Sequence, residues 1–330
     1  MKGLLGIDTG GTKCEALLIR DSGEVLGWGR STWRDPGSGS AKGGGGRSPE
    51  TVSLAVCQAL GDLHFDELHV MAIKGFRHHQ VVPAAAADKI LWRSTTEWAA
   101  ALSLAGVATG VVALAGTGAV VYAESRDGRL GHFDGLGPVL GDSGGGYQIG
   151  LQGIRAAAKA SLHPRHRTSL TLAINHALLG KNGILNNDDL VDFMAYRDRA
   201  KVAAAAHCVD TEARAGDPVA IRILQQQAGE LAETVRDAVD QLQMQDDDYT
   251  LVATGGVLRS SPIYRDAFFQ AVQRFAPKLK PYCSDLPAAA GLVMVELLKM
   301  HGHDAAGPAA RFLQSAREFF TKTENNKNTN

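Results

Sequence analysis

The sequence Asp8-Thr9-Gly10-Gly11-Thr12-Lys13 follows directly on a short apolar run that begins at Leu4. An apolar run that ends in glycines is typical of a buried strand followed by a tight turn. In such a turn the glycines let backbone N–H groups approach an anion, Asp8 can hold hydrated Mg²⁺ through water, and Thr12 can bond a phosphate oxygen. The turn therefore predicts a phosphate site, and the alternative is an ordinary glycine-rich hairpin turn.

The same strand–turn–strand pattern returns about one domain length later. The run from Val111 to Ala115 leads into Gly116-Thr117-Gly118 and then into a second apolar run, Ala119 to Ala123. A third apolar run ends in Thr254-Gly255-Gly256, whose paired glycines would let an adenine ring lie flat against the backbone. Three such turns in this order predict two similar α/β halves that face each other across a cleft.

The region between the second and third turns is almost wholly helical in its spacing of apolar residues. Its clearest helix runs to Leu242 and begins at Asp217-Pro218, which supply an N-cap and a first-turn proline. The second half is therefore expected to be helix-rich. A Gly/Ser-rich stretch from Asp35 to Arg47 predicts a loop that is either a flap on the substrate side or a surface insertion.

Composition excludes several classes of partner. The chain has 330 residues with 34 basic and 35 acidic side chains, so two domains are expected and no charged field would draw nucleic acid or an anionic membrane. No apolar run reaches the roughly 20 residues of a transmembrane helix, and the N-terminal run is too short for a signal peptide. The four cysteines lie far apart, which predicts reduced thiols in a cytoplasmic protein and no bound transition metal.

The three turns resemble the phosphate-1, phosphate-2 and adenosine motifs of the sugar kinase/heat-shock/actin superfamily. The segment Gly137 to Gly150 is similar to a Gly-Asp-x-Gly-Ser-x-Tyr segment of one branch, and the helical stretch Ala213 to Ala220 supports the same placement. From residue 3 to about residue 300 the chain resembles the BadF/BadG/BcrA/BcrD-type ATPases and their N-acetylglucosamine kinase branch.

The resemblance implies an α/β protein of two actin-like, ribonuclease H-like domains around an interdomain nucleotide cleft. It implies an N-terminal domain at residues 1–108 and a helix-rich C-terminal domain at 109–320, and the polar sequence at 321–330 predicts a disordered tail. The implied activity is ATP- and Mg²⁺-dependent phosphorylation of a sugar hydroxyl, with an amino sugar such as N-acetylglucosamine or glucosamine as substrate. A cytoplasmic homodimer is implied as well.

Site residues follow position by position from the same resemblance. Asp8 matches the aspartate that anchors Mg²⁺ through water, and Asp142, Gly75 and Glu97 match positions on the sugar side. The residues that match nucleotide-binding positions are Gly10, Gly11, Thr12, Lys13, Gly116, Thr117, Gly118, Gly255 and Gly256.

The general base of the family is an aspartate, and here Glu97 holds its place. A sugar hydroxyl needs a carboxylate to accept its proton, and glutamate can serve although it is one methylene longer. The alternative is an ordinary glutamate at a helix start. The family's asparagine-bearing sugar loop is replaced by the glycine-rich stretch after Pro36, and the segment Lys74 to His79 is either an anion contact or a solvated loop.

Two other functions fit the same fold. One is an activator-type ATPase that holds an iron–sulfur cluster with cysteines from two subunits, which the dispersed cysteines disfavour. The other is a sugar- or nucleotide-binding protein without turnover, which the replaced base motivates. A DNA-binding regulator would carry a helix-turn-helix before the first strand, and none is expected here.

Overall fold

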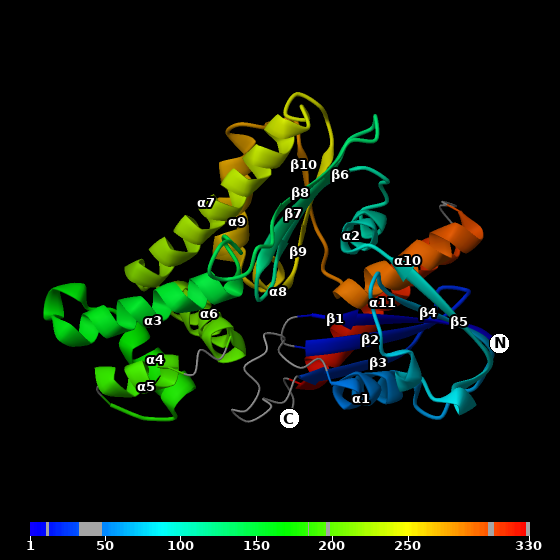
Figure 1. Cartoon of the computed structure of the whole chain (residues 1–330), viewed down its shortest axis with the longest axis horizontal. Helices are drawn as coiled ribbons and strands as arrows, with labels where there is room; N and C mark the ends of the chain where they lie inside the picture. The colour runs from blue at the N-terminus through cyan, green and yellow to red at the C-terminus, as the bar shows by residue number, and fades with distance from the viewer. Residues whose placement is uncertain (11–12, 33–47, 184, 196–198, 303–306, 328–330) are drawn as a thin grey trace. The chain divides into compact units, whose positions relative to one another are not determined.

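The computed structural model describes residues 1–10, 13–32, 48–183, 185–195, 199–302 and 307–327, and its contacts divide the chain into two compact units. Unit 1 joins Met1–Ala108 to Ser284–Asn330, and unit 2 is Thr109–Cys283. Each unit is built on one five-stranded sheet with both parallel and antiparallel pairs (Figure 1).

The sheet of unit 1 has the strand order β3-β2-β1-β4-β5. The first three strands form an antiparallel meander, whereas β4 and β5 run parallel to β1. The strands are β1 (Lys2–Thr9), β2 (Lys13–Arg20), β3 (Val25–Thr32), β4 (Phe65–Ile73) and β5 (Ala87–Thr95). The helices are α1 (Pro49–Leu60), the short η1 (His79–Val81) and η2 (Ala84–Ala86), α2 (Glu97–Leu104), α10 (Ala288–His301) and α11 (Pro308–Lys327).

Strand β1 is buried on both faces, which explains its unbroken apolar sequence. Leu5 and Ile7 pack with the buried side of α1, whereas Leu4 packs with residues of α10 and α11. Gly6 lies under α10, where an added Cβ would stand 2.5 Å from the carbonyl oxygen of Ala289. A helix from the C-terminal segment therefore completes the core of the first sheet.

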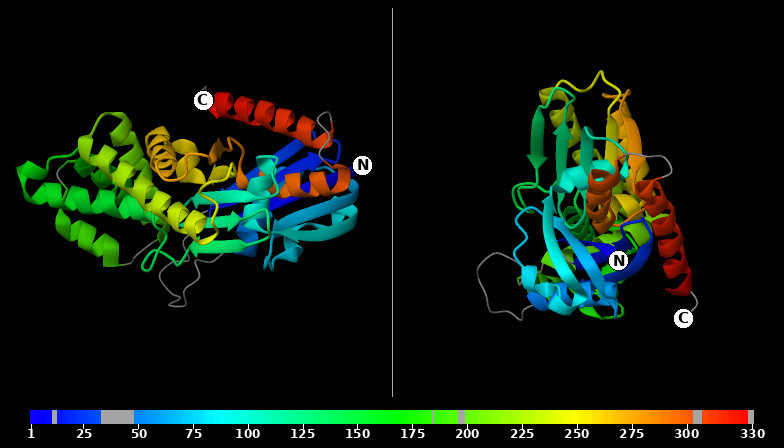
Figure 2. Two further views of the ribbon diagram at one scale, coloured as in Figure 1. Left: turned by 90° about the horizontal axis from the view of Figure 1, so that it is seen from above. Right: turned by 90° about the vertical axis from the view of Figure 1, so that its right-hand side faces the viewer.

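The C-terminal segment belongs to unit 1, and here the compact units differ from the domain ranges expected from sequence, which placed residues 284–320 in the second domain. Helix α11, red in Figure 2, packs with the same cluster as α10. It continues to Lys327, into the stretch expected to be disordered, and the Phe320 ring meets the Trp28 ring edge-on at 5.0 Å just before that stretch.

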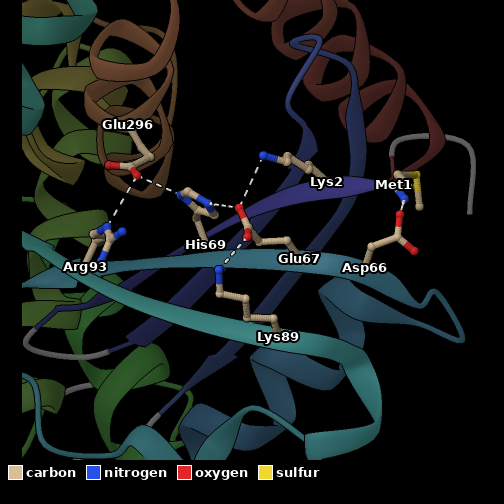
Figure 3. A network of polar contacts seen from close by, with 8 residues as sticks. All are labelled: Met1, Lys2, Asp66, Glu67, His69, Lys89, Arg93 and Glu296. Atoms are coloured by element: carbon tan, nitrogen blue, oxygen red, sulfur yellow. Dashed lines mark hydrogen bonds and ion pairs between the residues drawn. The ribbon is translucent and has the colours of Figure 1, made fainter.

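A buried polar network also fixes α10 to the sheet. Figure 3 shows the ring of His69 on β4 between the carboxylates of Glu67 and Glu296. Lys2 and Lys89 contact Glu67, and Arg93 lies 3.7 Å from Glu296. The network gives the carboxylate of the buried Glu296, whose exposed fraction is 3%, two polar partners, His69 and Arg93.

The sheet of unit 2 has the order β10-β9-β6-β7-β8. Its strands are β6 (Gly110–Ala115), β7 (Ala119–Glu124), β8 (Leu130–Asp134), β9 (Thr250–Thr254) and β10 (Lys280–Cys283). The helices are α3 (Gly146–Leu162), η3 (Pro164–His166), α4 (Leu170–Leu179), α5 (Asn187–Ala195), α6 (Arg199–Arg214), α7 (Pro218–Gln241), α8 (Gly256–Ser260) and α9 (Pro262–Gln273).

One continuous core joins these helices to the second sheet. The long helix α7 packs on β7 and β8 (Figure 1). Its predicted start is confirmed, since the Asp217 carboxylate accepts hydrogen bonds from the N–H groups of Val219 and Ala220 ahead of Pro218. The expected helix-rich second half is confirmed as well.

None of the helices in the described part of the chain is both long enough and apolar enough to cross a bilayer.

Candidate functional site

The first glycine turn and two other predicted site residues lie at one edge of the sheet of unit 1. Strands β1, β4 and β5 are parallel, with Ile7 opposite Ala72 and Ile73 opposite Thr95. Their carboxyl ends therefore share an edge, where ligands commonly bind in open α/β sheets. Asp8 lies near the end of β1 and Gly10 follows it, Gly75 follows β4, and Glu97 follows β5, so the fold brings these four residues to the same edge.

The first turn itself is described in part. Gly11 and Thr12 lie outside the described residues, and a Cβ added to Gly10 would lie 3.5 Å from the Lys13 carbonyl oxygen. The Lys13 ammonium contacts the buried carboxylate of Glu15. Burial, followed by the carboxylates of Asp8 and Glu15, raises the pKa of the neighbouring Cys14 thiol to about 12, so that this cysteine stays a neutral thiol.

Glu97 is placed by a helix cap. It is the first residue of α2, and the Thr96 hydroxyl before it accepts a hydrogen bond from the Ala99 N–H at 3.3 Å. This capping holds the helix start in place at the end of β5.

The loop after β4 begins beside that cap. The Lys74 N–H donates to the Thr95 carbonyl at 2.8 Å, and Gly75 has a positive φ of 95° with open space around it. Farther along, the rings of Phe76 and His79 lie 5.8 and 4.4 Å from the Trp92 ring. The aromatic part of this loop therefore packs on β5 and is not simply solvated.

The second and third glycine turns share an edge of the sheet of unit 2. Strands β6 and β9 are parallel, with Leu114 opposite Thr254, so Gly116-Thr117-Gly118 and Gly255-Gly256 follow neighbouring strand ends. The second turn is closed by a hydrogen bond from the Gly116 N–H to the Gly118 carbonyl at 2.9 Å.

The first turn of α3 also holds this second glycine turn. The N–H groups of Gly146 and Tyr147 donate to the carbonyls of Gly116 and Thr117 at 2.8 and 2.9 Å. These bonds engage the carbonyl oxygens of the turn on the α3 side. The backbone of the turn is therefore held in one conformation, as a preorganised anion site requires.

Gly255 and Gly256 differ in the reason for their lack of a side chain. Gly255 has a φ of 97°, and a Cβ there would lie 2.3 Å from the Ala115 carbonyl oxygen, so only glycine fits between β9 and β6. Gly256 begins α8, and a Cβ there would meet nothing within 4 Å. The open face at Gly256 is the one that a flat ligand could use.

Asp142 packs against the second turn. Its exposed fraction is 4%, and its Oδ2 would lie 2.5 Å from a Cβ added to Gly118. The Arg199 Nη2 donates to the same Oδ2 at 2.6 Å. Burial raises the pKa of Asp142 above its ordinary value, and the Arg199 cation opposes that rise.

Sequence reasoning missed Asp134, which shapes the segment that contains Asp142. The Asp134 carboxylate accepts hydrogen bonds from the backbone N–H groups of Asp142 at 2.7 Å and Ser143 at 2.8 Å. Burial opposes its ionisation, but these bonds outweigh burial and hold the pKa of Asp134 below its ordinary value. A cavity of about 510 Å³ adjoins it, lined by His132, Phe133, Asp134, Leu136, Leu140, Gly141, Ser143, Thr234 and Asp237.

The predicted residues thus form two groups, one on each unit, and each group lies at the carboxyl ends of parallel strands. The model of the BadF/BadG/BcrA/BcrD ATPase family matches residues 5–281, a range that includes all three glycine turns. The chain belongs to the BadF/BadG/BcrA/BcrD ATPase family.

Two curated relatives of the chain carry kinase names. The N-acetylmuramic acid/N-acetylglucosamine kinase of Clostridium acetobutylicum is 30% identical over 189 residues, which are 56% of this chain and 60% of that protein. The N-acetyl-D-glucosamine kinase of Dictyostelium discoideum is 31% identical over 173 residues, 51% of this chain and 53% of that protein. The matched part thus spans only a little over half the length of each relative.

Solved structures establish the fold of the chain. A protein from Chromobacterium violaceum assigned as an N-acetylglucosamine kinase superposes with a TM-score of 0.62 at 20% identity, covering 90% of this chain and 99% of that one. A ROK family glucokinase from Streptomyces griseus, in complex with glucose and AMPPNP, gives 0.54 at 18% identity, with 88% and 97% covered. The predicted α/β actin-like fold is confirmed.

Proposed function

We propose that this ATPase is an ATP-dependent sugar kinase that phosphorylates a hydroxyl of an amino sugar such as N-acetylglucosamine or glucosamine. The observation that carries the proposal is the shared edge of the first sheet, where Asp8 lies near the end of β1 and Glu97 follows the parallel strand β5. A kinase needs one carboxylate for the metal and another for the acceptor proton. The kinase names of the two curated relatives support the substrate class.

The glycine turns would bind the nucleotide. Backbone N–H groups of the first turn at Gly10 and of Gly116-Thr117-Gly118 would receive the phosphates, and the open backbone at Gly256 would receive the adenine face. Gly11, Thr12 and Lys13 keep the phosphate role expected from sequence as part of this proposal.

Mg²⁺ would be held by Asp8 through water. Among the described residues, no group of three or more His, Cys, Asp or Glu side chains is placed to hold a metal ion. A single carboxylate such as Asp8 fits Mg²⁺, which usually keeps several waters and takes one or two carboxylates together with substrate phosphates. When bound, Mg²⁺ would neutralise charge on the phosphates. The protein would contribute the Asp8 carboxylate, which strand β1 holds near its end.

Glu97 would accept the proton of the attacking hydroxyl. Its position at the first turn of α2 is fixed by the Thr96 cap, which limits the freedom of a side chain longer than the family's aspartate. Gly75, on the neighbouring strand end, would leave room for the sugar. For Asp142 the sugar contact stays a prediction, because an exposed fraction of 4% leaves little of its surface for a ligand.

The test is ATP consumption by the full chain with a panel of added sugars. The proposal predicts that amino sugars stimulate consumption, that Asp8→Asn abolishes the stimulation, and that the exposed control Glu24→Gln keeps it. A panel without any stimulation over basal hydrolysis would refute the kinase and favour a binding protein without turnover. The expected cytoplasmic homodimer stays a prediction. Light scattering of the purified chain would test whether it is a dimer.

A further inference from the structure

Arg199 is tied to the second glycine turn through Asp142. The Arg199 Nη2 donates to the Asp142 Oδ2 at 2.6 Å, and that same oxygen lies against Gly118. The exposed fractions of the two side chains are 51% for Arg199 and 5% for Asp142. A buried carboxylate thus joins a half-exposed guanidinium to the turn expected to hold phosphate.

The carboxylate in this arrangement is itself held in place. Asp142 has a positive φ of 57°, an uncommon backbone for a residue other than glycine, and the Asp134 carboxylate accepts its N–H at 2.7 Å. A free arginine side chain loses rotamer entropy when a ligand fixes it. Anchoring Arg199 on a fixed acid meets part of that cost before any ligand arrives.

The anchor leaves the guanidinium suited to an anion. A guanidinium carries five N–H donors in a planar fork that matches phosphate oxygens, and the contact with Asp142 uses Nη2. Because Asp142 packs on Gly118, the half-exposed side of Arg199 is kept near the Gly116–Gly118 turn. Among anions, the phosphate chain of ATP is the one proposed to lie at this turn.

We propose that Arg199 is a phosphate-binding residue of the second glycine turn and that Asp142 is the residue that positions it. The inference rests on the proposed function. During transfer, the bond between the terminal phosphorus and the bridging oxygen of ADP breaks, a bond from phosphorus to the sugar oxygen forms, and the hydroxyl proton passes to Glu97. Arg199 would stabilise the charge on the phosphate oxygens throughout this step.

The test compares the binding of ATP and of adenosine by calorimetry on the full chain without sugar. Arg199→Gln should weaken ATP binding on the order of tenfold to a hundredfold and leave adenosine binding unchanged, because only ATP has the phosphates that Arg199 contacts. Arg199→Lys should fall between the two, since lysine keeps the charge but not the fork. The matched control Arg236→Gln removes an ion pair with Glu233 on α7 and should change neither.

Three outcomes would overturn the inference. Equal weakening of ATP and adenosine would mean that Arg199 only supports the fold. Unchanged ATP binding with a raised KM for an acidic sugar would assign Arg199 to the acceptor. Absence of ATP binding by the unchanged chain would refute the proposed function as well, whereas Arg199-dependent ATP binding without sugar turnover would refute the kinase alone.

Discussion

The Nδ1 atom of His69 lies 2.8 Å from the Oε1 atom of Glu296, and this contact joins strand β4 to helix α10 across 227 residues of sequence. The other ring nitrogen lies 2.9 Å from a carboxylate oxygen of Glu67 (Figure 3). The buried ring therefore ties the C-terminal segment to the first sheet.

Replacing this ring should destabilise unit 1. His69→Gln removes the ring that contacts two carboxylates, and leaving a buried polar group without its hydrogen-bond partner costs about 1–3 kcal/mol. Urea unfolding followed by circular dichroism measures the loss. The control His64→Gln deletes a histidine whose partner Asp88 is 70% exposed, and its effect should be clearly smaller. Similar small losses of unfolding free energy in both variants would contradict a stabilising role for the contacts of His69 with Glu67 and Glu296.

The same network predicts a pH dependence. Hydrogen bonds from His69 and then Lys89 hold the pKa of Glu67 at about 2, below its ordinary value of 4.5. Because the folded pKa is lowered, the stabilisation from Glu67 is fully present above pH 4.5 and is lost as pH falls toward 2. The free energy of unfolding should therefore fall less steeply over this range in Glu67→Gln than in the unchanged chain, with Lys89→Gln between them. Parallel curves would show that Glu67 does not take part.

The two adjacent glycines of the third turn should respond differently to alanine. Gly255→Ala forces a methyl group against the Ala115 carbonyl at a positive φ, so it should destabilise unit 2 by about 2 kcal/mol or more. Gly256→Ala meets open space and should leave the melting temperature unchanged. It should nonetheless weaken ATP binding by about tenfold, because the methyl group would crowd the proposed adenine face. Unchanged ATP affinity in Gly256→Ala would mean that the adenine ring does not bind at this turn.

Glu97→Gln should separate catalysis from binding. The substitution keeps the length of the side chain and the Thr96 cap, so the fold and the KM for ATP should be kept. Loss of the carboxylate that accepts the proton should lower kcat on the order of a hundredfold or more. Glu97→Asp, which restores the residue type of the family, should retain more activity than Glu97→Gln. Equal kcat in all three chains would leave Glu97 as an ordinary helix-start residue.

Local patterns were sufficient to predict the strands and turns that carry the site. The apolar run at Leu4 and the run at Val111 each gave a buried strand followed by a glycine turn, and the Asp217-Pro218 cap marked the start of α7. These signals act over a few residues, and so they can be seen in the sequence.

Other elements have no such signal. Strand β5 carries the exposed Asp88 and Lys89, and the short β10 contains Pro281, as edge strands often do, so neither shows the pattern of a buried strand. The packing of α10 on β1 depends on Gly6 meeting Ala289, and no local pattern says which sheet a helix covers. For the same reason the Arg199 contact with Asp142, across 57 residues, could not be foreseen.

The central claim is that the terminal phosphate of ATP moves to a sugar. Its most direct test is incubation of the full chain with Mg²⁺, ATP labelled in the terminal phosphate and N-acetylglucosamine or glucosamine, followed by separation of the products. We predict that the label appears on the sugar in step with ADP, and that Asp8→Asn prevents this. Label found only in inorganic phosphate, or left in ATP with every sugar supplied, would contradict the account.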